Sequence, residues 1–171
     1  MTSPLTLILG GARSGKTRYA ETLIKALPQP WTYVATAEIC DEEMRERIAR
    51  HQADRSEKGW ITQEAPVDIW QALAGHTPVL VDCLTLWLTN LMLGEHHLID
   101  AFDRLDQALE ARKAPTFLVA NEVGLGIVPD NKLARDFRDH AGRLHQRIAA
   151  RADRVVLMVA GLPLVVKTAQ N

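Results

Sequence analysis

A glycine-rich segment near the start of the chain constrains the fold more than any other feature. It reads GGARSGKT, from Gly10 to Thr17, and fits the pattern G-x-x-x-x-G-K-[ST] in full. An apolar run, Leu5–Leu9, precedes it, and an amphipathic stretch, Lys16–Ala26, follows it. Because this pattern functions between a buried strand and a helix, the sequence predicts a βα unit whose connecting loop wraps a phosphate group.

Each residue type in this segment has a reason in phosphate chemistry. Glycines let the backbone turn and bring several N–H donors to one anion, and the following helix adds its own N-terminal N–H groups. We expect Lys16 to reach the β- and γ-phosphates of a nucleoside triphosphate and Thr17 to bind Mg²⁺ through its hydroxyl. The candidate nucleotide-binding residues here are Gly10, Gly11, Ala12, Arg13, Ser14, Gly15, Lys16 and Thr17.

Further apolar runs alternate with helical patterns along the chain. Continuous apolar runs are typical of parallel strands that are covered on both faces. After Leu5–Leu9, the expected strands are Thr32–Ala35, Pro78–Val81, Thr116–Ala120 and Val155–Val159, and Leu164–Val166 could add an edge strand. After Lys16–Ala26, the expected helices are Asp41–Arg50, Leu84–Leu93, Ile99–Arg112 and Asn131–Arg151. The pattern predicts one α/β domain over residues 1–171, a P-loop NTPase fold with a mostly parallel sheet and helices on both faces.

Composition excludes several classes of partner. The formal net charge is −1, so the chain lacks the positive field that attracts nucleic acid or anionic membranes. No stretch approaches the roughly 20 apolar residues of a membrane span. Cys40 and Cys83 have no paired spacing and are expected to be free thiols in a reducing compartment. With no basic leader before the apolar run, a cytoplasmic enzyme is expected.

A carboxylate directly follows the expected strand Pro78–Val81. P-loop proteins commonly place such a carboxylate at the end of a neighbouring strand, where it organises Mg²⁺. Asp82 occupies this position, and an aspartate here would also suit an ordinary helix N-cap before Leu84. We favour the catalytic reading, with Thr17 and Asp82 as the metal-binding pair.

One histidine is harder to explain by packing alone. Met44, Ile48 and His51 are spaced four and three residues apart, so they share one face of the expected helix. A histidine in this position is more often a partly buried structural residue than a catalytic one. The alternative is a nucleophile, because a neutral imidazole can attack an α-phosphate and hold a nucleotidyl group. Such a residue would add nucleotidyl transfer to the chemistry of the phosphate loop.

The phosphate loop by itself allows either an NTP-driven switch or a transferase. The segment NEVG at 121–124 follows an expected strand but lacks the Lys and Asp of the guanine-reading N/T-K-x-D motif. A chain of 171 residues also leaves little room for a separate effector domain. These observations favour a small-molecule kinase or nucleotidyltransferase over a switch.

Five segments together are distinctive enough to indicate a family. They are GGARSGKT (10–17), YVATAE (33–38), DEEMRERIARH (41–51), VDCLTLWLTNLM (81–92) and the C-terminal region from NEVGLGIVPDNK to LVVK (121–167). Together they closely resemble the bifunctional adenosylcobinamide kinase and adenosylcobinamide-phosphate guanylyltransferase family of cobalamin biosynthesis, over nearly the whole chain. The resemblance implies phosphorylation of adenosylcobinamide with ATP or GTP. It then implies transfer of GMP from GTP, through a guanylyl-histidine, to give adenosylcobinamide-GDP.

The resemblance also implies roles for particular residues. His51 stands in the family's EM-x-x-RI-x-x-H context and would be the guanylylated nucleophile. Glu64 matches a family glutamate of a TxEEP segment, although Ala65 replaces the second acid here. Family members assemble as homo-oligomers, so a trimer is expected. The remaining residues that match segments beside the nucleotide are Ala35, Thr36, Ala37, Gln52, Ala53, Asp54 and Arg55.

Three questions stay open at this level. NEVGLGIVPDN could be a purely structural loop or a wall of the corrinoid or nucleotide site. Either Asp82 or Glu122 could accept the proton of the substrate hydroxyl. The apolar helix Leu84–Leu93 could bury Trp87 in the core, which we favour, or present it at a subunit contact.

Overall fold

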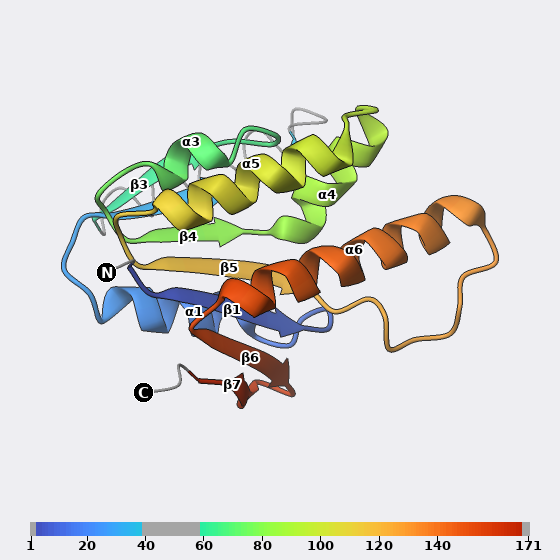
Figure 1. The fold of residues 1–171 in the computed structure, drawn as a ribbon. Coiled ribbons are helices and arrows are strands. Elements are labelled where there is room, and N and C mark those ends of the chain that lie inside the picture. The colour runs from blue at the N-terminus through green and yellow to red at the C-terminus, as the bar shows by residue number, and fades with distance from the viewer. Residues whose placement is uncertain (1–2, 39–58, 169–171) are drawn as a thin grey trace.

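In the part of the chain that the structure describes, residues 3–38 and 59–168, seven strands form one sheet (Figure 1). In this computed structural model the strand order is β3-β2-β4-β5-β1-β6-β7, and only β7 runs antiparallel to its neighbour. The strands are β1 (Leu5–Gly10), β2 (Trp31–Ala35), β3 (Trp60–Glu64), β4 (Val79–Asp82), β5 (Thr116–Asn121), β6 (Arg154–Val159) and β7 (Leu162–Lys167).

Helices cover both faces of this sheet, and each face has its own hydrophobic core. The helices are α1 (Lys16–Lys25), α3 (Trp70–Leu73), α4 (Leu84–Leu93), α5 (Leu98–Ala111) and α6 (Lys132–Arg151). Helix α1 packs with Ile8, Leu80 and Val156 on one face, whereas α3, α4, α5 and α6 pack on the other. The expected α/β fold with a mostly parallel sheet is confirmed. None of the helices in the described ranges is both long and apolar enough to cross a bilayer.

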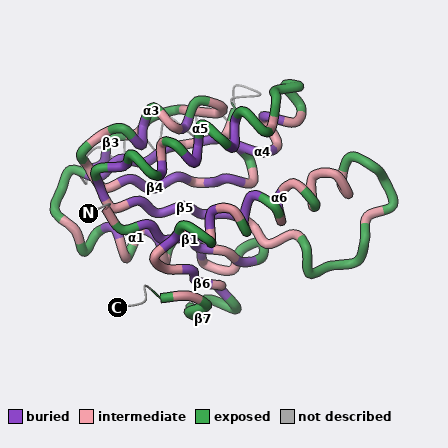
Figure 2. The backbone as a smooth tube through the Cα atoms, in the orientation of Figure 1, coloured by how far each residue is buried: buried purple, intermediate pink, exposed green. Residues whose placement is uncertain are grey.

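The central strands are buried because both of their faces are covered (Figure 2). Strands β1, β4 and β5 are almost entirely buried, which agrees with their continuous apolar runs. Trp87 is fully buried, and its Nε1 donates to the carbonyl oxygen of Val67 at 2.7 Å. The core alternative for Trp87 is therefore confirmed.

Two elements of the structure were not predicted from the sequence, and one expected helix falls outside the described residues. Strand β3 lies at the edge of the sheet, where only β2 pairs with it, and most of its residues are exposed or half-buried. An edge strand of this kind has no continuous apolar run, so its pattern is weak. The helix α3 was also not predicted, because its four residues are too few to show a helical period. The expected helix Asp41–Arg50 lies outside the described ranges.

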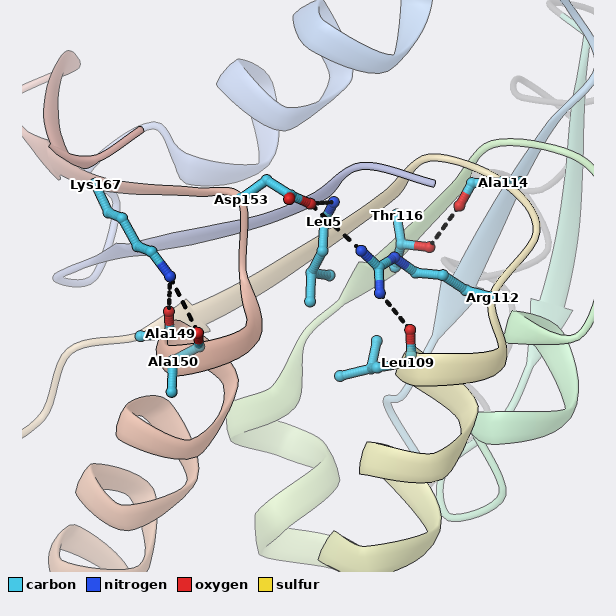
Figure 3. Close-up of polar contacts among 9 residues, drawn as sticks. All are labelled: Leu5, Leu109, Arg112, Ala114, Thr116, Ala149, Ala150, Asp153 and Lys167. Carbon is cyan, nitrogen blue, oxygen red and sulfur yellow. Dashed lines mark hydrogen bonds and ion pairs between the residues drawn. The ribbon is translucent and has the colours of Figure 1, made fainter. Parts of the chain in front are cut away.

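A buried arginine, Arg112, lies near the starts of β1 and β6, at the end of the sheet opposite the phosphate loop (Figure 3). The Arg112 guanidinium donates to the carbonyl oxygen of Leu109 at the end of α5, and to Asp153 Oδ2 at 3.3 Å. The same Asp153 oxygen accepts a hydrogen bond from the Leu5 backbone N–H at 2.7 Å. Burial lowers the pKa of Arg112, and Asp153 opposes that shift. These contacts join the end of α5 to the starts of β1 and β6.

We therefore expect Arg112→Ala to reduce the free energy of unfolding by about 2 kcal/mol, because it removes a buried donor set and its packing. Asp153 is half exposed, so water can replace part of its lost partner, and this limits the effect. Urea denaturation measures the change, with the exposed Arg143→Ala as the matched control. Equal stability of the two variants would contradict this assignment.

Candidate functional site

The glycine-rich segment forms a loop between β1 and α1, as the sequence predicts. A Cβ atom on Gly10 would lie 2.5 Å from Ser14 Oγ and 2.8 Å from the Met158 carbonyl oxygen, so no larger residue fits there. Gly15 has φ +91°, in the left-handed region that favours glycine, and it caps the start of α1. Residues Gly11, Ala12 and Arg13 are exposed, so the loop presents its outer surface to solvent.

Lys16 is folded over this loop and is largely buried. Its Nζ donates to the Gly11 carbonyl oxygen at 2.5 Å and lies 3.4 Å from Ser14 Oγ. Only 7% of the residue is exposed. Desolvation lowers the pKa of Lys16, and the nearby Cys83 and Asp82 oppose that shift. The structure therefore places the Lys16 ammonium group against the phosphate loop, near enough to Asp82 to feel its charge.

Asp82 and Thr17 meet although they come from different strand–helix units. The Thr17 hydroxyl donates to Asp82 Oδ2 at 2.9 Å, and the buried Tyr33 hydroxyl donates to the same oxygen, also at 2.9 Å. Strand β5 lies between β1 and β4, so the start of α1 must reach across one strand to make this contact. A hydroxyl and a carboxylate oxygen form the kind of hard donor pair that Mg²⁺ prefers.

The carboxyl ends of β2, β3 and β4 lie in register beside this pair. Ala35 pairs with Glu64 of β3 on one side and with Asp82 of β4 on the other. Glu64 is exposed and Ala37 is half-buried, so both reach the surface at this edge. The structure thus brings Ala35, Ala37, Glu64 and Asp82 to one edge of the sheet.

Thr36 differs from its neighbours because it is fully buried. Its hydroxyl donates to the Cys83 carbonyl oxygen at 2.7 Å and accepts from the Cys83 N–H at 2.8 Å. Asn90 of α4 adds a second tie, since its Nδ2 donates to the carbonyl oxygens of Thr36 (2.7 Å) and Pro66 (2.9 Å). The Thr36 side chain therefore braces the strand that carries Asp82 and does not itself line an open site.

Sequence reasoning missed Tyr33 and Asn90 in these supporting roles. Neither residue was assigned a role from the sequence. The amide within LTLWLTNLML was the available signal, because a half-buried amide on such a helix needs hydrogen-bond partners.

Five of the sequence-predicted site residues lie outside the described ranges. These are His51, Gln52, Ala53, Asp54 and Arg55, and their assignments stay predictions. Cys40 also lies outside these ranges, whereas Cys83 is a buried free thiol whose pKa is raised, mainly by desolvation.

The segment NEVG starts directly beside the phosphate loop. The Glu122 N–H donates to the Gly10 carbonyl oxygen at 2.9 Å, and the Asn121 N–H donates to Thr85 Oγ1 at 2.7 Å. After Asn121, residues 122–131 form a loop that extends away from the rest of the domain before α6 begins (Figure 1). Burial lowers the pKa of His145 on α6, and the nearby Glu122 carboxylate opposes that shift.

Two cavities adjoin this 122–131 loop. One, of about 480 Å³, lies against Gly11 and Ser14 of the phosphate loop. The other, of about 430 Å³, lies between α4 and α6 and is lined mainly by apolar side chains such as Met92, Val123 and Phe137. The site therefore offers a phosphate-binding loop, a hydroxyl–carboxylate pair, and open space on the side of Glu122.

Comparison with known proteins finds relatives that match nearly the whole chain. Residues 6–166 match the family model described as cobinamide kinase / cobinamide phosphate guanyltransferase. A protein of Pseudomonas aeruginosa, the bifunctional adenosylcobalamin biosynthesis protein CobP, is 46% identical over 94% of this chain and 96% of its own length. The bifunctional adenosylcobalamin biosynthesis protein CobU of Salmonella typhimurium is 41% identical over 95% of this chain and 99% of its own length.

A solved structure shares the fold at much lower sequence identity. A KaiC-like protein from Pyrococcus horikoshii superposes with a TM-score of 0.53 and 14% identity, over 98% of this chain and 81% of that protein. This likeness supports the P-loop fold alone. The family match spans nearly the whole chain, both relatives exceed 40% identity, and the phosphate loop has the expected geometry. The chain therefore belongs to the cobinamide kinase / cobinamide phosphate guanyltransferase family.

Proposed function

We propose that this chain phosphorylates adenosylcobinamide with ATP or GTP, and then transfers GMP from GTP to the new phosphate to give adenosylcobinamide-GDP. The observation that carries the proposal is the arrangement of Lys16, Thr17 and Asp82 around the glycine-rich loop, in a chain of this family. Enzymes that transfer phosphoryl groups commonly combine a P-loop, its lysine and a carboxylate at the end of a neighbouring strand.

In the kinase step the chain would mainly position the substrates and stabilise the charge of the transition state. Backbone N–H groups of the loop and the N-terminus of α1 would bind the phosphate oxygens. The Lys16 ammonium would stabilise the charge that develops on the transferred phosphoryl group. The substrate hydroxyl would attack the γ-phosphorus in line with the leaving nucleoside diphosphate. The position of the Lys16 Nζ beside Gly11 and Ser14 of the loop supports this role.

Mg²⁺ is part of the proposal, and Thr17 and Asp82 are the residues that would hold it. When bound, the cation would neutralise charge on the nucleotide phosphates. Among the described residues no cluster of three or more His, Cys, Asp or Glu side chains could hold a metal ion. Mg²⁺ usually takes one or two protein carboxylates and completes its shell with water and phosphate oxygens.

The guanylyltransferase step would use His51 as the nucleophile. Its neutral imidazole would attack the α-phosphorus of GTP, forming a P–N bond as pyrophosphate leaves. A phosphate oxygen of the corrinoid would then displace the histidine and break that bond. This assignment is supported by the match of residues 41–51 to the family pattern. Residues Gln52–Arg55, with Ala35, Ala37 and Glu64, are proposed to lie near this GTP.

We also propose that the protein assembles as a homo-oligomer, with a trimer as the expected state. The 122–131 loop and its surroundings support this, because Leu93, Leu125, Ile127 and Val128 are each more than half exposed. A cytoplasmic location is proposed as well. The free thiol of Cys83 supports it, since unpaired cysteines are typical of reducing compartments.

Labelling with GTP tests the two-step function directly. Incubation with α-³²P-GTP is expected to label the protein through a bond that is labile in acid and stable in alkali, as a phosphoramidate is. His51→Ala should lose this label and still phosphorylate adenosylcobinamide from ATP. His97→Ala, which changes an exposed histidine, is the matched control and should be labelled like the wild type.

Two results would contradict the proposal. A label that persists in His51→Ala would exclude that residue as the nucleophile. NTP hydrolysis that yields no phosphorylated corrinoid, and that rises on addition of a protein partner, would instead favour a switch.

A further inference from the structure

The contacts of Lys16 indicate which part of the loop would face the γ-phosphate. Its Nζ lies 2.5 Å from the Gly11 carbonyl oxygen and 3.4 Å from Ser14 Oγ. A P-loop lysine reaches the β- and γ-phosphates. Gly11 and Ser14 therefore flank the position of the transferred group.

The cavity of about 480 Å³ opens at these same two residues. Its other walls come from the 122–131 loop and the end of β6, and most of them are apolar, such as Val123, Leu157 and Met158. Among the described residues that line it, Glu122 is the one titratable side chain. At about 30 Å³ for each water-sized group, the volume holds roughly sixteen non-hydrogen atoms. It suits the side arm of an acceptor and not a whole macrocycle.

Glu122 is held at this cavity by its own backbone and by a nearby glycine. Its N–H donates to the Gly10 carbonyl oxygen at 2.9 Å, which ties it to the first residue of the phosphate loop. Its carboxylate Oε1 accepts from the Gly124 N–H at 2.5 Å. A Cβ atom on Gly124 would come within 2.9 Å of that oxygen, so glycine permits the close approach. The carboxylate is thus anchored within the wall of the cavity.

Asp82 is less suited to accept the substrate proton. Its Oδ2 already accepts hydrogen bonds from Thr17 and Tyr33, both at 2.9 Å. It does not line the cavity next to Gly11 and Ser14. The two carboxylates therefore have separate surroundings, one beside the Thr17 hydroxyl and the other in the wall of the cavity.

We propose that this cavity binds the hydroxyl-bearing side arm of the corrinoid acceptor, and that Glu122 is the catalytic base of the kinase step. The inference rests on the proposed function. The acceptor oxygen forms a bond to the γ-phosphorus, and the bond from that phosphorus to the β–γ bridging oxygen breaks. Its electron pair stays on the departing nucleoside diphosphate, and the hydroxyl proton passes to the Glu122 carboxylate.

Replacement of Glu122 by glutamine tests the base. Glu122→Gln keeps the shape and the acceptor oxygen for Gly124 but loses the basic carboxylate. We expect kcat for phosphorylation of adenosylcobinamide to fall by about 10²-fold, and KM for the acceptor to change little. Glu122→Asp keeps the charge and should recover part of kcat. Glu110→Gln, on the exposed face of α5, is the matched control.

Replacement of Val123 by phenylalanine tests the cavity independently of the base. The larger side chain should raise KM for adenosylcobinamide by about 10-fold, because it fills space that the side arm needs. KM for ATP should stay within about twofold. Unchanged KM for the acceptor would show that the side arm binds elsewhere.

The outcomes separate this inference from the proposed function. Suppose that the wild type phosphorylates the corrinoid and that a folded Glu122→Gln protein keeps the wild-type kcat. This result overturns the role of Glu122 as the base and leaves the proposed function intact. A wild type that phosphorylates no corrinoid overturns both. Thermal melting and labelling by α-³²P-GTP show whether each variant is folded.

Discussion

Lys16→Met is expected to reduce phosphorylation of adenosylcobinamide by about 10³-fold, without loss of stability. The reduction follows because the Lys16 ammonium is the cation that the structure places inside the phosphate loop. Stability should be kept because the charge is buried at a cost, which is why desolvation lowers the pKa of this lysine. Methionine fills a similar volume without that cost.

Steady-state kinetics and urea denaturation, measured on the same preparation, check both halves of this prediction. Lys113→Met, which changes an exposed lysine, is the matched control and should behave as the wild type. If Lys16→Met keeps more than about a tenth of wild-type kcat/KM, Lys16 does not have the role that P-loop chemistry assigns to it.

Asp82→Asn is expected to weaken the affinity for Mg²⁺ strongly and to cost about 10²-fold in activity at physiological Mg²⁺. The asparagine can place its carbonyl oxygen where Oδ2 now accepts from Thr17 and Tyr33, so the local geometry should survive. Its missing negative charge removes the main attraction for the cation. The effect should therefore be a loss of metal affinity and not a loss of folding.

Activity measured over a range of Mg²⁺ concentrations, at saturating ATP, separates these alternatives. We expect the Mg²⁺ concentration for half-maximal rate to rise by about 10- to 100-fold, the range typical of losses at metal sites. Asp139→Asn, on the exposed side of α6, is the matched control. An unchanged Mg²⁺ dependence would mean that another group holds the cation.

Hydrogen bonds from neighbouring loops and helices hold the surroundings of the Thr17–Asp82 pair in place. Asp82 ends β4, and Thr36 and Asn90 tie this strand end to the loops after β2 and β3. Gly161, in the turn between β6 and β7, donates to the Ser14 carbonyl oxygen at 3.1 Å and supports the phosphate loop from the other side. Catalysis by positioning requires such fixed surroundings.

Much of the fold follows from local sequence patterns. Strands β1, β4, β5 and β6 are short apolar runs, and each is close to its expected bounds because burial on both faces requires apolar residues throughout. Strand β3 was missed because it lies at the sheet edge, where half of its surface meets solvent and the pattern carries little information. Strand β7 is exposed too, and only part of it, Leu164–Val166, could be anticipated.

Some features of the candidate site also follow from local sequence, whereas others depend on the tertiary structure. GGARSGKT by itself determined a phosphate loop between a strand and a helix, because the spacing of its glycines, lysine and threonine reflects requirements that are local to one turn of the chain. The His51 assignment rests on the resemblance of residues 41–51 to the family pattern, and it stays a prediction. Contacts between distant segments were decided only by the tertiary structure. The order of strands in the sheet brings Asp82 to Thr17, and Glu122 to the first residue of the loop. The Thr17–Asp82 pair was expected by analogy with other P-loop proteins. No local pattern encodes the Glu122 contact, because it depends on which strands become neighbours when the whole core packs.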